Sequence, residues 1–199
     1  MSNKLQMFRN TPKNDAPFGE ALAADLARFR EESRGLRTLG RGVLSQGFHA
    51  VLVYRMFRWC FEHGLPTQPF RFLLERFIEV TTGISIPVQA KIGKGLRIHH
   101  FGGIMIHPET VIGAHCTLYH EVTLGDRGGW GGAPLVGNNV IIGAGAKVLG
   151  RITIGDNVFI GANAVVLTSI PANSIAVGNP AVVKPQTMCS NMVSECHNG

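Results

Sequence analysis

The most regular feature of the chain is an aliphatic residue at every sixth position, a pattern that begins just after Gly83. It runs through Ile86, Ile92, Ile98, Ile106, Ile112, Leu118, Leu124, Val136, Ile142, Val148, Ile154, Ile160 and Val166. A small or β-branched residue often follows four places later, as at Ala90, Cys116 and Ala146. Hexads repeated over this length are the sequence signal of a β-helix.

The period of six predicts three short strands per turn of a triangular coil. The aliphatic residue of each hexad points into a narrow prism, and the small residue lets the next corner turn within it. Gly, Asn and Asp residues at the corners supply the positive φ angles that such turns require. Since every coil stacks its strands on the coil before it, only the two ends of the stack expose sheet edges.

Before Gly83 the apolar residues recur at helical spacing. One helix is predicted over 16–32, Ser45 is the expected N-cap of a second that stops at Gly64, and Thr67 that of a third through Ile78. We expect the aromatic residues of this region to pack the helices together. The alternative is weak contact with a membrane surface, because basic and aromatic groups mix at Arg55, Arg58, Trp59, Arg71 and Arg76.

These patterns divide the chain into three segments. Residues 1–82 form a helical region, residues 83–185 form the β-helix, and residues 186–199 are expected to be a flexible tail because they are polar and lack a repeat.

Composition and charge narrow the classes of function. The formal net charge of +6 suits an anionic cofactor. The basic residues are scattered and no binding motif accompanies them, which argues against nucleic acid as a partner. The N-terminus lacks the apolar core of a signal peptide, so we expect a cytoplasmic protein. The four cysteines (Cys60, Cys116, Cys189 and Cys196) show no metal-type pair and are expected to be reduced thiols.

The hexad register breaks twice, and breaks in a repeat often carry function. Two residues are added between Ile98 and Ile106, across the sequence Ile-His-His-Phe-Gly-Gly that ends at Gly103. A glycine-rich segment from Asp126 to Pro134 replaces whole hexads further on. A glycine-rich segment that projects from a stiff coil is a natural wall for a binding site.

At these breaks the sequence resembles the serine acetyltransferase family of hexapeptide-repeat acyltransferases. The resemblance rests on the histidine-containing break, on Val-Thr-Leu-Gly before the glycine-rich loop, on Ile-Gly-Ala-Gly-Ala-Lys (142–147) and on Val-Gly-Asn-Pro-Ala (177–181). It implies a left-handed parallel β-helix, a homotrimer with active sites between subunits, and acetyl-coenzyme A (acetyl-CoA) as the acyl donor. It implies no metal.

The resemblance also assigns a catalytic base. The family's general base is a histidine in an Asp-His-Ala-Thr-Gly motif, and the matching position here is His100. An alcohol attacks a thioester only when a base near pKa 6.5 takes its proton, which is the chemistry of histidine. Trp130, in the glycine-rich loop, is a second candidate: it either stacks on a sugar ring, offers its backbone N–H to the oxyanion, or anchors the loop.

Three groups that read L-serine in the family are replaced in this chain. His99 stands for the aspartate before the base, Ser85 stands for the orienting aspartate, and Ala133 with Pro134 stands where an Arg-His pair is expected. A carboxylate substrate loses its charged partner through these changes. We therefore predict a saccharide hydroxyl as the acceptor, as in the related acetyltransferases of polysaccharide and capsule assembly, with L-serine as the alternative.

The remaining site residues are expected around the base. Substrate is predicted to contact His99, His120, Asp126 and Trp130. Small residues that the family uses beside the pantetheine arm correspond to Gly143, Ala144 and Ala162, and the candidates for the phosphate end are Lys147 and Lys184. The group that orients His100 is left open among Ser85, Asp126 and Glu121.

Two other classes of function fit parts of the pattern. His107 and His120 are expected near the same face as His100, and His115 lies five residues before His120, so a zinc site like that of the β-helix carbonic anhydrases is one alternative. A non-catalytic β-helix scaffold is the other. Acetyl transfer is favoured over both by the glycine-rich loop and by the terminal Gly-Asn-Pro-Ala.

Overall fold

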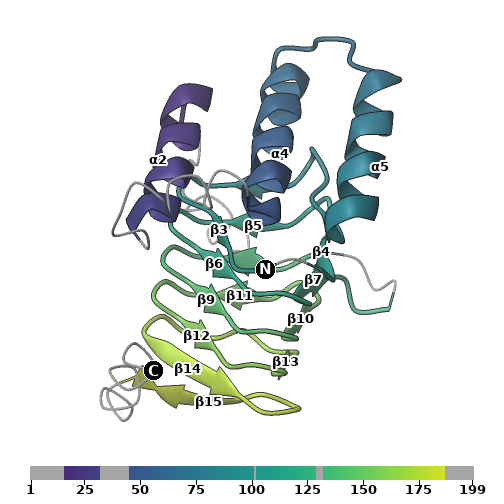
Figure 1. The fold of residues 1–199 in the computed structure, drawn as a ribbon. Helices are drawn as coiled ribbons and strands as arrows, with labels where there is room; N and C mark the ends of the chain where they lie inside the picture. Colours follow the sequence, from purple (N-terminus) through teal and green to yellow (C-terminus); the bar gives the residue numbers. More distant parts are fainter. Residues whose placement is uncertain (1–15, 32–44, 101, 129–131, 187–199) are drawn as a thin grey trace, which may run out of the picture.

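The computed structural model describes residues 16–31, 45–100, 102–128 and 132–186, and the tail from residue 187 onward lies outside the described residues. Three helices stand side by side on one end of a β-helix, and the chain then winds downward to its last strands (Figure 1). The helices are α2 (Phe18–Glu31), α4 (Gln46–Glu62) and α5 (Phe70–Thr82). The predicted parallel β-helix with N-terminal helices is confirmed.

The predicted start of α4 is also confirmed. The hydroxyl of Ser45 accepts a hydrogen bond from the backbone N–H of Phe48 at 3.2 Å, which satisfies a donor that the first helical turn leaves open. The predicted start of α5 is wrong. Its N-cap is Pro69, which makes no side-chain cap hydrogen bond, while the Thr67 carbonyl accepts from Arg71 N–H at 2.8 Å.

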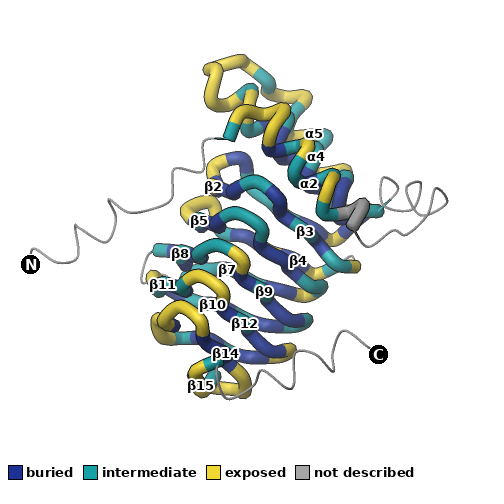
Figure 2. Tube along the Cα trace, turned by 90° about the vertical axis from the view of Figure 1, so that its left-hand side faces the viewer, coloured by how far each residue is buried: buried dark blue, intermediate teal, exposed yellow. Residues whose placement is uncertain are grey.

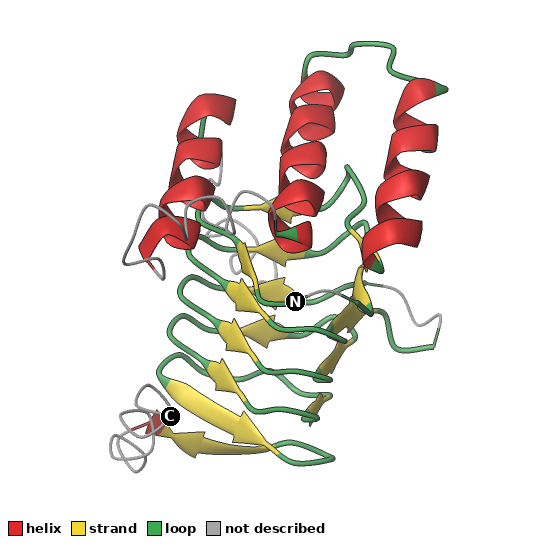
Figure 3. Cartoon of the chain, viewed as in Figure 1, coloured by secondary structure: helices red, strands yellow, loops and turns green. Residues whose placement is uncertain are grey.

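Fifteen short strands of the described chain form three sheets, one on each side of the triangular coil (Figure 3). Sheet A contains β1 (Ile84–Ser85), β4 (Ile104–Ile106), β7 (Thr123–Gly125), β10 (Lys147–Leu149) and β13 (Val165–Val166). Sheet B contains β2 (Lys91–Ile92), β5 (Val111–Ile112), β8 (Leu135–Val136) and β11 (Thr153–Ile154). Sheet C contains β3 (Arg97–Ile98), β6 (Thr117–Leu118), β9 (Ile141–Ile142), β12 (Phe159–Ile160), β14 (Ser174–Val177) and β15 (Val182–Pro185).

All strand pairs within these sheets are parallel except β14 with β15, which form an antiparallel hairpin at the lower end. We name the three corners of the coil by the sheets that they join: A/B, B/C and C/A. Because a strand of one sheet leads to a strand of the next, each corner is a column of turns, one per coil.

The hexads behave as predicted. Every aliphatic position of the pattern is buried except Ile86, which is half-buried. Figure 2 shows the buried residues along the inside of the strands, with the exposed ones at the corners and on the helices. The core is thus a single column of aliphatic side chains, as the period of six requires.

The upper end of the coil is closed by side chains of the helices. The Asp25 carboxylate on α2 accepts from the Arg55 guanidinium on α4 at 2.9 Å and from Leu96 N–H at 2.8 Å. Arg55 also donates to the carbonyls of Ile92 and Gly93, both at 2.6 Å. Both charged groups are buried, so the pair satisfies edge groups of the first coil that another coil would otherwise bond.

Aromatic packing of the helices is only partly as expected. Phe48 and Phe57 are buried, but one face of α5 is exposed at Phe70, Leu73 and Phe77, because no element of the described chain covers it. The arginines behind the membrane alternative are engaged within the chain: Arg55 is buried against Asp25, and the other three lie in ion pairs with Glu62, Glu75 and Glu79. Among the described residues no helix has the length and apolar character to cross a bilayer.

Candidate active site

The C/A corner places most of the predicted site residues in one column. The pairing of sheet C aligns β3, β6, β9 and β12, so the residues just after these strands stack coil upon coil. The first position after each strand is His99, Tyr119, Gly143 and Gly161 in turn. The second position is His100, His120, Ala144 and Ala162. The predicted base and the predicted cofactor residues therefore share one corner.

His100 lies in a turn and has an unusual backbone conformation there. Its φ is +64°, a left-handed conformation that few residues other than glycine adopt, and its side chain is exposed. In the lower coils the left-handed residue comes one place later, at Glu121, Gly145 and Asn163. The two residues added in the first break shift the turn, and this shift holds the imidazole out from the corner.

The ring of His99 lies flat on the ring of Tyr119, with centroids 4.7 Å apart and an angle of 9° between the planes. His99 therefore forms part of the wall beside the base. Tyr119 was not among the residues predicted from the sequence. The offset of twenty residues between the two coils is the signal that pairs the two positions, since His99 N–H donates to Leu118 just before Tyr119.

The ring of His120 meets the ring of His100 edge to face, with centroids 5.7 Å apart. In the part of the chain that the structure describes, neither ring nitrogen of His100 forms a hydrogen bond with another side chain. None of the three residues left open as its orienting group is bonded to it there. The base is thus placed by its backbone and by its neighbouring rings.

The lower half of the corner is narrow because it lacks side chains. A Cβ added to Gly143 would lie 2.6 Å from the backbone nitrogen of Ala162, so the two coils touch there through main chain alone. Ala144 is half-exposed and Ala162 is exposed. The corner below the two histidines is thus lined by the small residues Gly143, Ala144, Gly161 and Ala162, which leave room for a slender ligand arm, and we call this stretch the groove.

The two predicted phosphate-binding lysines lie in different places. Lys147 begins β10 beside the same corner, and its ammonium group donates to the Glu121 carbonyl at 2.5 Å. Lys184 lies on β15, where it pairs with Ile175 on β14 at the lower end of the coil. Of the two, only Lys147 therefore lies beside the C/A corner.

The second break lies at the A/B corner, at the opposite end of the sheet A strands. Asp126 directly follows β7, so one chain does not bring it to the C/A corner. Trp130 lies outside the described residues. Across this corner Gly132 approaches Arg151 so closely that a Cβ would lie 2.9 Å from the arginine side chain. Gly132 therefore packs on the next coil of the same corner.

The histidines of the zinc alternative are separated. His107 follows β4 at the A/B corner, where its Nδ1 accepts from Glu109 N–H at 3.2 Å. His115 lies at the B/C corner with φ +59°. The expectation that His107 shares a face with His100 is wrong, because a strand of sheet A separates them. Within the described residues no group of three or more His, Cys, Asp or Glu side chains is placed to hold a metal ion.

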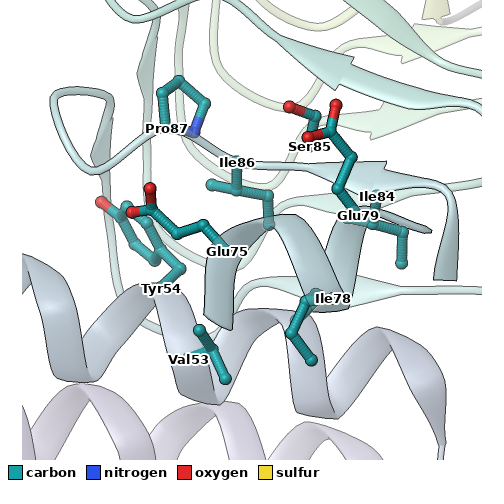
Figure 4. A pocket seen from close by; sticks show the side chains of 10 residues that line it. Val53, Tyr54, Glu75, Ile78, Glu79, Ile84, Ser85, Ile86 and Pro87 are labelled. Carbon is teal, nitrogen blue, oxygen red and sulfur yellow. The ribbon is translucent and has the colours of Figure 1, made fainter. Parts of the chain in front are cut away.

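Ser85, at the position of the family's orienting aspartate, faces a cavity of about 150 Å³ between α4, α5 and the first coil. Tyr54, Glu75 and Glu79 also line it (Figure 4). Burial raises the pKa of Glu75 and raises that of Tyr54 to about 12. This cavity belongs to the helical end and is distinct from the groove at the C/A corner.

The described cysteines are free thiols, as expected. Cys116 is buried in the column of the core, where its thiol donates to the Gly137 carbonyl at 3.1 Å. Burial raises the pKa of this thiol to about 11. Cys116 is therefore a packing residue and no nucleophile. Cys189 and Cys196 lie outside the described residues.

Comparisons with known proteins bear on the fold and the family of the chain. The sequence signature of bacterial transferase hexapeptides (six repeats) matches residues 133–168. The chain is 47% identical over 166 residues to the serine acetyltransferase of Helicobacter pylori, covering 80% of this chain and 94% of that protein. The solved serine acetyltransferase of Neisseria gonorrhoeae superposes with a TM-score of 0.76 at 31% identity, covering 85% of this chain and 67% of that one.

A third relative was solved with a ligand. The structure of a Brucella abortus serine acetyltransferase in complex with coenzyme A gives a TM-score of 0.76 at 28% identity, covering 90% of this chain and 72% of that one. The names of these relatives favour the serine alternative and give no support to the saccharide acceptor that the replaced residues predicted.

Proposed function

The chain belongs to the serine acetyltransferase family and is an acyltransferase that uses acetyl-CoA; on that premise we propose that it transfers the acetyl group to the hydroxyl of L-serine. The 47% identity that spans nearly the whole of a curated serine acetyltransferase carries this proposal. The exposed imidazole of His100 above a groove floored by Gly143 supports it, because base and donor then meet at one corner.

The reaction follows from acetyl-transfer chemistry. Neutral His100 takes the proton of the hydroxyl as its oxygen attacks the thioester carbon, so a C–O bond forms and the carbonyl oxygen becomes an oxyanion. The tetrahedral intermediate then collapses with cleavage of the C–S bond. The leaving thiolate of coenzyme A takes the proton from the imidazolium, which returns His100 to its neutral form.

A saccharide hydroxyl is the second candidate, and the make-up of the corner favours it. His99 is stacked on Tyr119, and Ser85 faces the cavity beneath α5, so neither offers the carboxylate that would read an amino group. Ala133 is buried and uncharged where the family carries part of its Arg-His pair. A neutral polyol needs no such charged partners, whereas an amino acid gains specificity from them.

Assembly as a homotrimer is also part of the proposal. His100 lies at the C/A corner and the glycine-rich loop at the A/B corner, so a single chain holds the two predicted walls of the site on different edges. A threefold arrangement of prisms sets one corner of each copy against another corner of its neighbour. Light scattering checks this directly: a trimer mass is expected, and a stable monomer at micromolar concentration contradicts it.

The acceptor is tested by release of free thiol from acetyl-CoA. L-serine should react with kcat/KM in the ordinary enzyme range of about 10⁴–10⁸ M⁻¹s⁻¹, while sugars offered at the same concentration should not. D-serine is the matched control, because it has the same groups in the wrong arrangement. Turnover of a sugar with L-serine inert would replace the proposal by the second candidate.

A further inference from the structure

We propose that His120 is a second catalytic residue, whose Nε2–H donates a hydrogen bond to the carbonyl oxygen of the acetyl thioester. The inference rests on the proposed use of the C/A corner for acetyl transfer, but it does not depend on which hydroxyl is the acceptor. It begins from the position of His120, one coil below the base and one coil above the small residues of the groove.

The hydrogen bonding of the ring fixes where its proton lies. The Nδ1 atom of His120 is buried and has no hydrogen-bond partner in the described chain. A proton on Nδ1 would be a buried donor without an acceptor, which is rarer in proteins than an unused acceptor. The neutral ring therefore carries its proton on Nε2, and this nitrogen is the one left to act outside the chain.

The order of the column brings that N–H to the reacting group. A donor whose arm lies along Ala162 and Ala144 reaches the level of His120 before it reaches the level of His100. The two rings meet edge to face at 5.7 Å without a hydrogen bond between them. Because the rings touch edge to face, the two imidazoles form one continuous surface at this corner. The acetyl carbonyl can then lie against the His120 part of that surface and the hydroxyl against the His100 part.

The step balances with two imidazoles in separate roles. His100 takes the hydroxyl proton and later returns it to the leaving thiolate. His120 keeps its own proton throughout, and its Nε2–H bond to oxygen strengthens as the carbonyl oxygen becomes an oxyanion. A donor of this kind acts chiefly on the transition state, so its loss lowers kcat more than it raises KM.

The test uses the intact protein and two substitutions. His120→Gln keeps an N–H donor near the place of Nε2, and His120→Leu keeps similar bulk without a donor. We expect His120→Leu to lower kcat about 10²–10³-fold with little change in KM for acetyl-CoA, and His120→Gln to recover most of that loss. If His120→Leu kept the parent kcat, the proposal would be overturned.

A measurement without any acceptor separates this inference from the proposed function. The infrared band of the thioester carbonyl is recorded for carbon-13-labelled acetyl-CoA bound to the parent and to each variant. The band should shift to lower frequency in the parent and in His120→Gln, and return to its solution value in His120→Leu. An unshifted band in the parent would refute the role of His120, whereas a serine assay that fails beside a shifted band would refute only the choice of acceptor.

Discussion

The upper and lower halves of the C/A corner follow strands in the same register, but they carry different side chains. The two upper coils carry four rings, those of His99, His100, Tyr119 and His120, whereas the two lower coils carry Gly143, Ala144, Gly161 and Ala162. The strands before them are in register, so apart from the shifted turn at His100 the difference arises from side chains. A repetitive coil thus makes a site by varying the residues at one corner. The upper coils carry the reactive histidines, and the lower coils carry the small residues of the groove.

The largest effect is expected from removal of the base in the upper half. His100→Asn should lower kcat by about 10²–10⁴ and leave the affinity for acetyl-CoA nearly unchanged, because the imidazole acts on the acceptor proton. Asparagine is the sharper choice than alanine, since it tolerates the left-handed φ of this turn. Steady-state kinetics and calorimetric binding of coenzyme A measure the two quantities.

The matched control for that variant is His115→Asn at the B/C corner. His115 has nearly the same left-handed φ, and asparagines occupy its place in the coils below, at Asn139, Asn157 and Asn173. This control should keep full activity. A similar loss of kcat in both variants would show that the left-handed turn matters and the imidazole of His100 does not.

The next effect concerns stability, because the upper coils depend on a buried ion pair at the helical end and the lower coils do not. Arg55→Met leaves the buried Asp25 carboxylate with only the Leu96 N–H, and it removes donors from the carbonyls of Ile92 and Gly93. Breaking a buried pair in this way should cost about 3–5 kcal/mol of unfolding free energy, measured in urea. Hydrogen exchange should quicken in β2 and β3 and stay slow in β9 and β12. Uniform quickening would contradict a separate role for the helical end.

A smaller effect tests the lower half as a groove. Ala162→Leu fills an exposed position in the column, so it should raise KM for acetyl-CoA about tenfold, or about 1.4 kcal/mol, with kcat nearly unchanged. Ala114→Leu places the same side chain at the equivalent turn of the B/C corner and should leave both constants alone. Equal effects of the two substitutions would mean that the donor does not use the C/A corner.

The smallest effect concerns the cavity above the first coil. Burial raises the pKa of Glu75 on folding, so the charged carboxylate costs stability once the pH exceeds its unfolded pKa of about 4.3. Glu75→Gln should therefore raise the melting temperature slightly at pH 7 and leave it unchanged near pH 4, where the carboxyl is protonated. Glu79→Gln, which breaks an exposed ion pair, is the control and should give no such gain.

The sequence predicts the coil well because each hexad repeats one local rule. The aliphatic positions from Ile92 to Val166 are buried, and the stacking of the strands places His100 at the same corner as Gly143 and Ala162. The hexad count does not show which of the three corners a residue occupies once a break intervenes. For that reason His107 was expected near His100, although β4 carries it to the A/B corner.

The helical end was harder to predict because its contacts are not periodic. The pairing of Asp25 with Arg55 joins two helices to the first coil through single side chains, and no spacing in the sequence predicts it. Similarly, the apolar spacing of α5 predicts a buried face, but Phe70 and Phe77 stay largely exposed in the described chain, although the edge of Phe70 meets Phe57 on α4. The stack of Tyr119 on His99 became evident only when the strands on either side were in register.

The regular spacing of the coils also acts as a ruler for the acyl donor. Parallel strands lie about 4.8 Å apart, so the three steps from His100 down to Ala162 measure roughly 14 Å along the corner. The length of a donor decides how many of these levels it contacts. A long carrier spans all four, whereas a small donor such as acetyl phosphate reaches only the histidines and makes none of the lower contacts. Duplicating one coil below His120 would move Ala144 and Ala162 one coil spacing further from the histidines. The protein would then need a longer acyl carrier, although the histidines themselves would be unchanged.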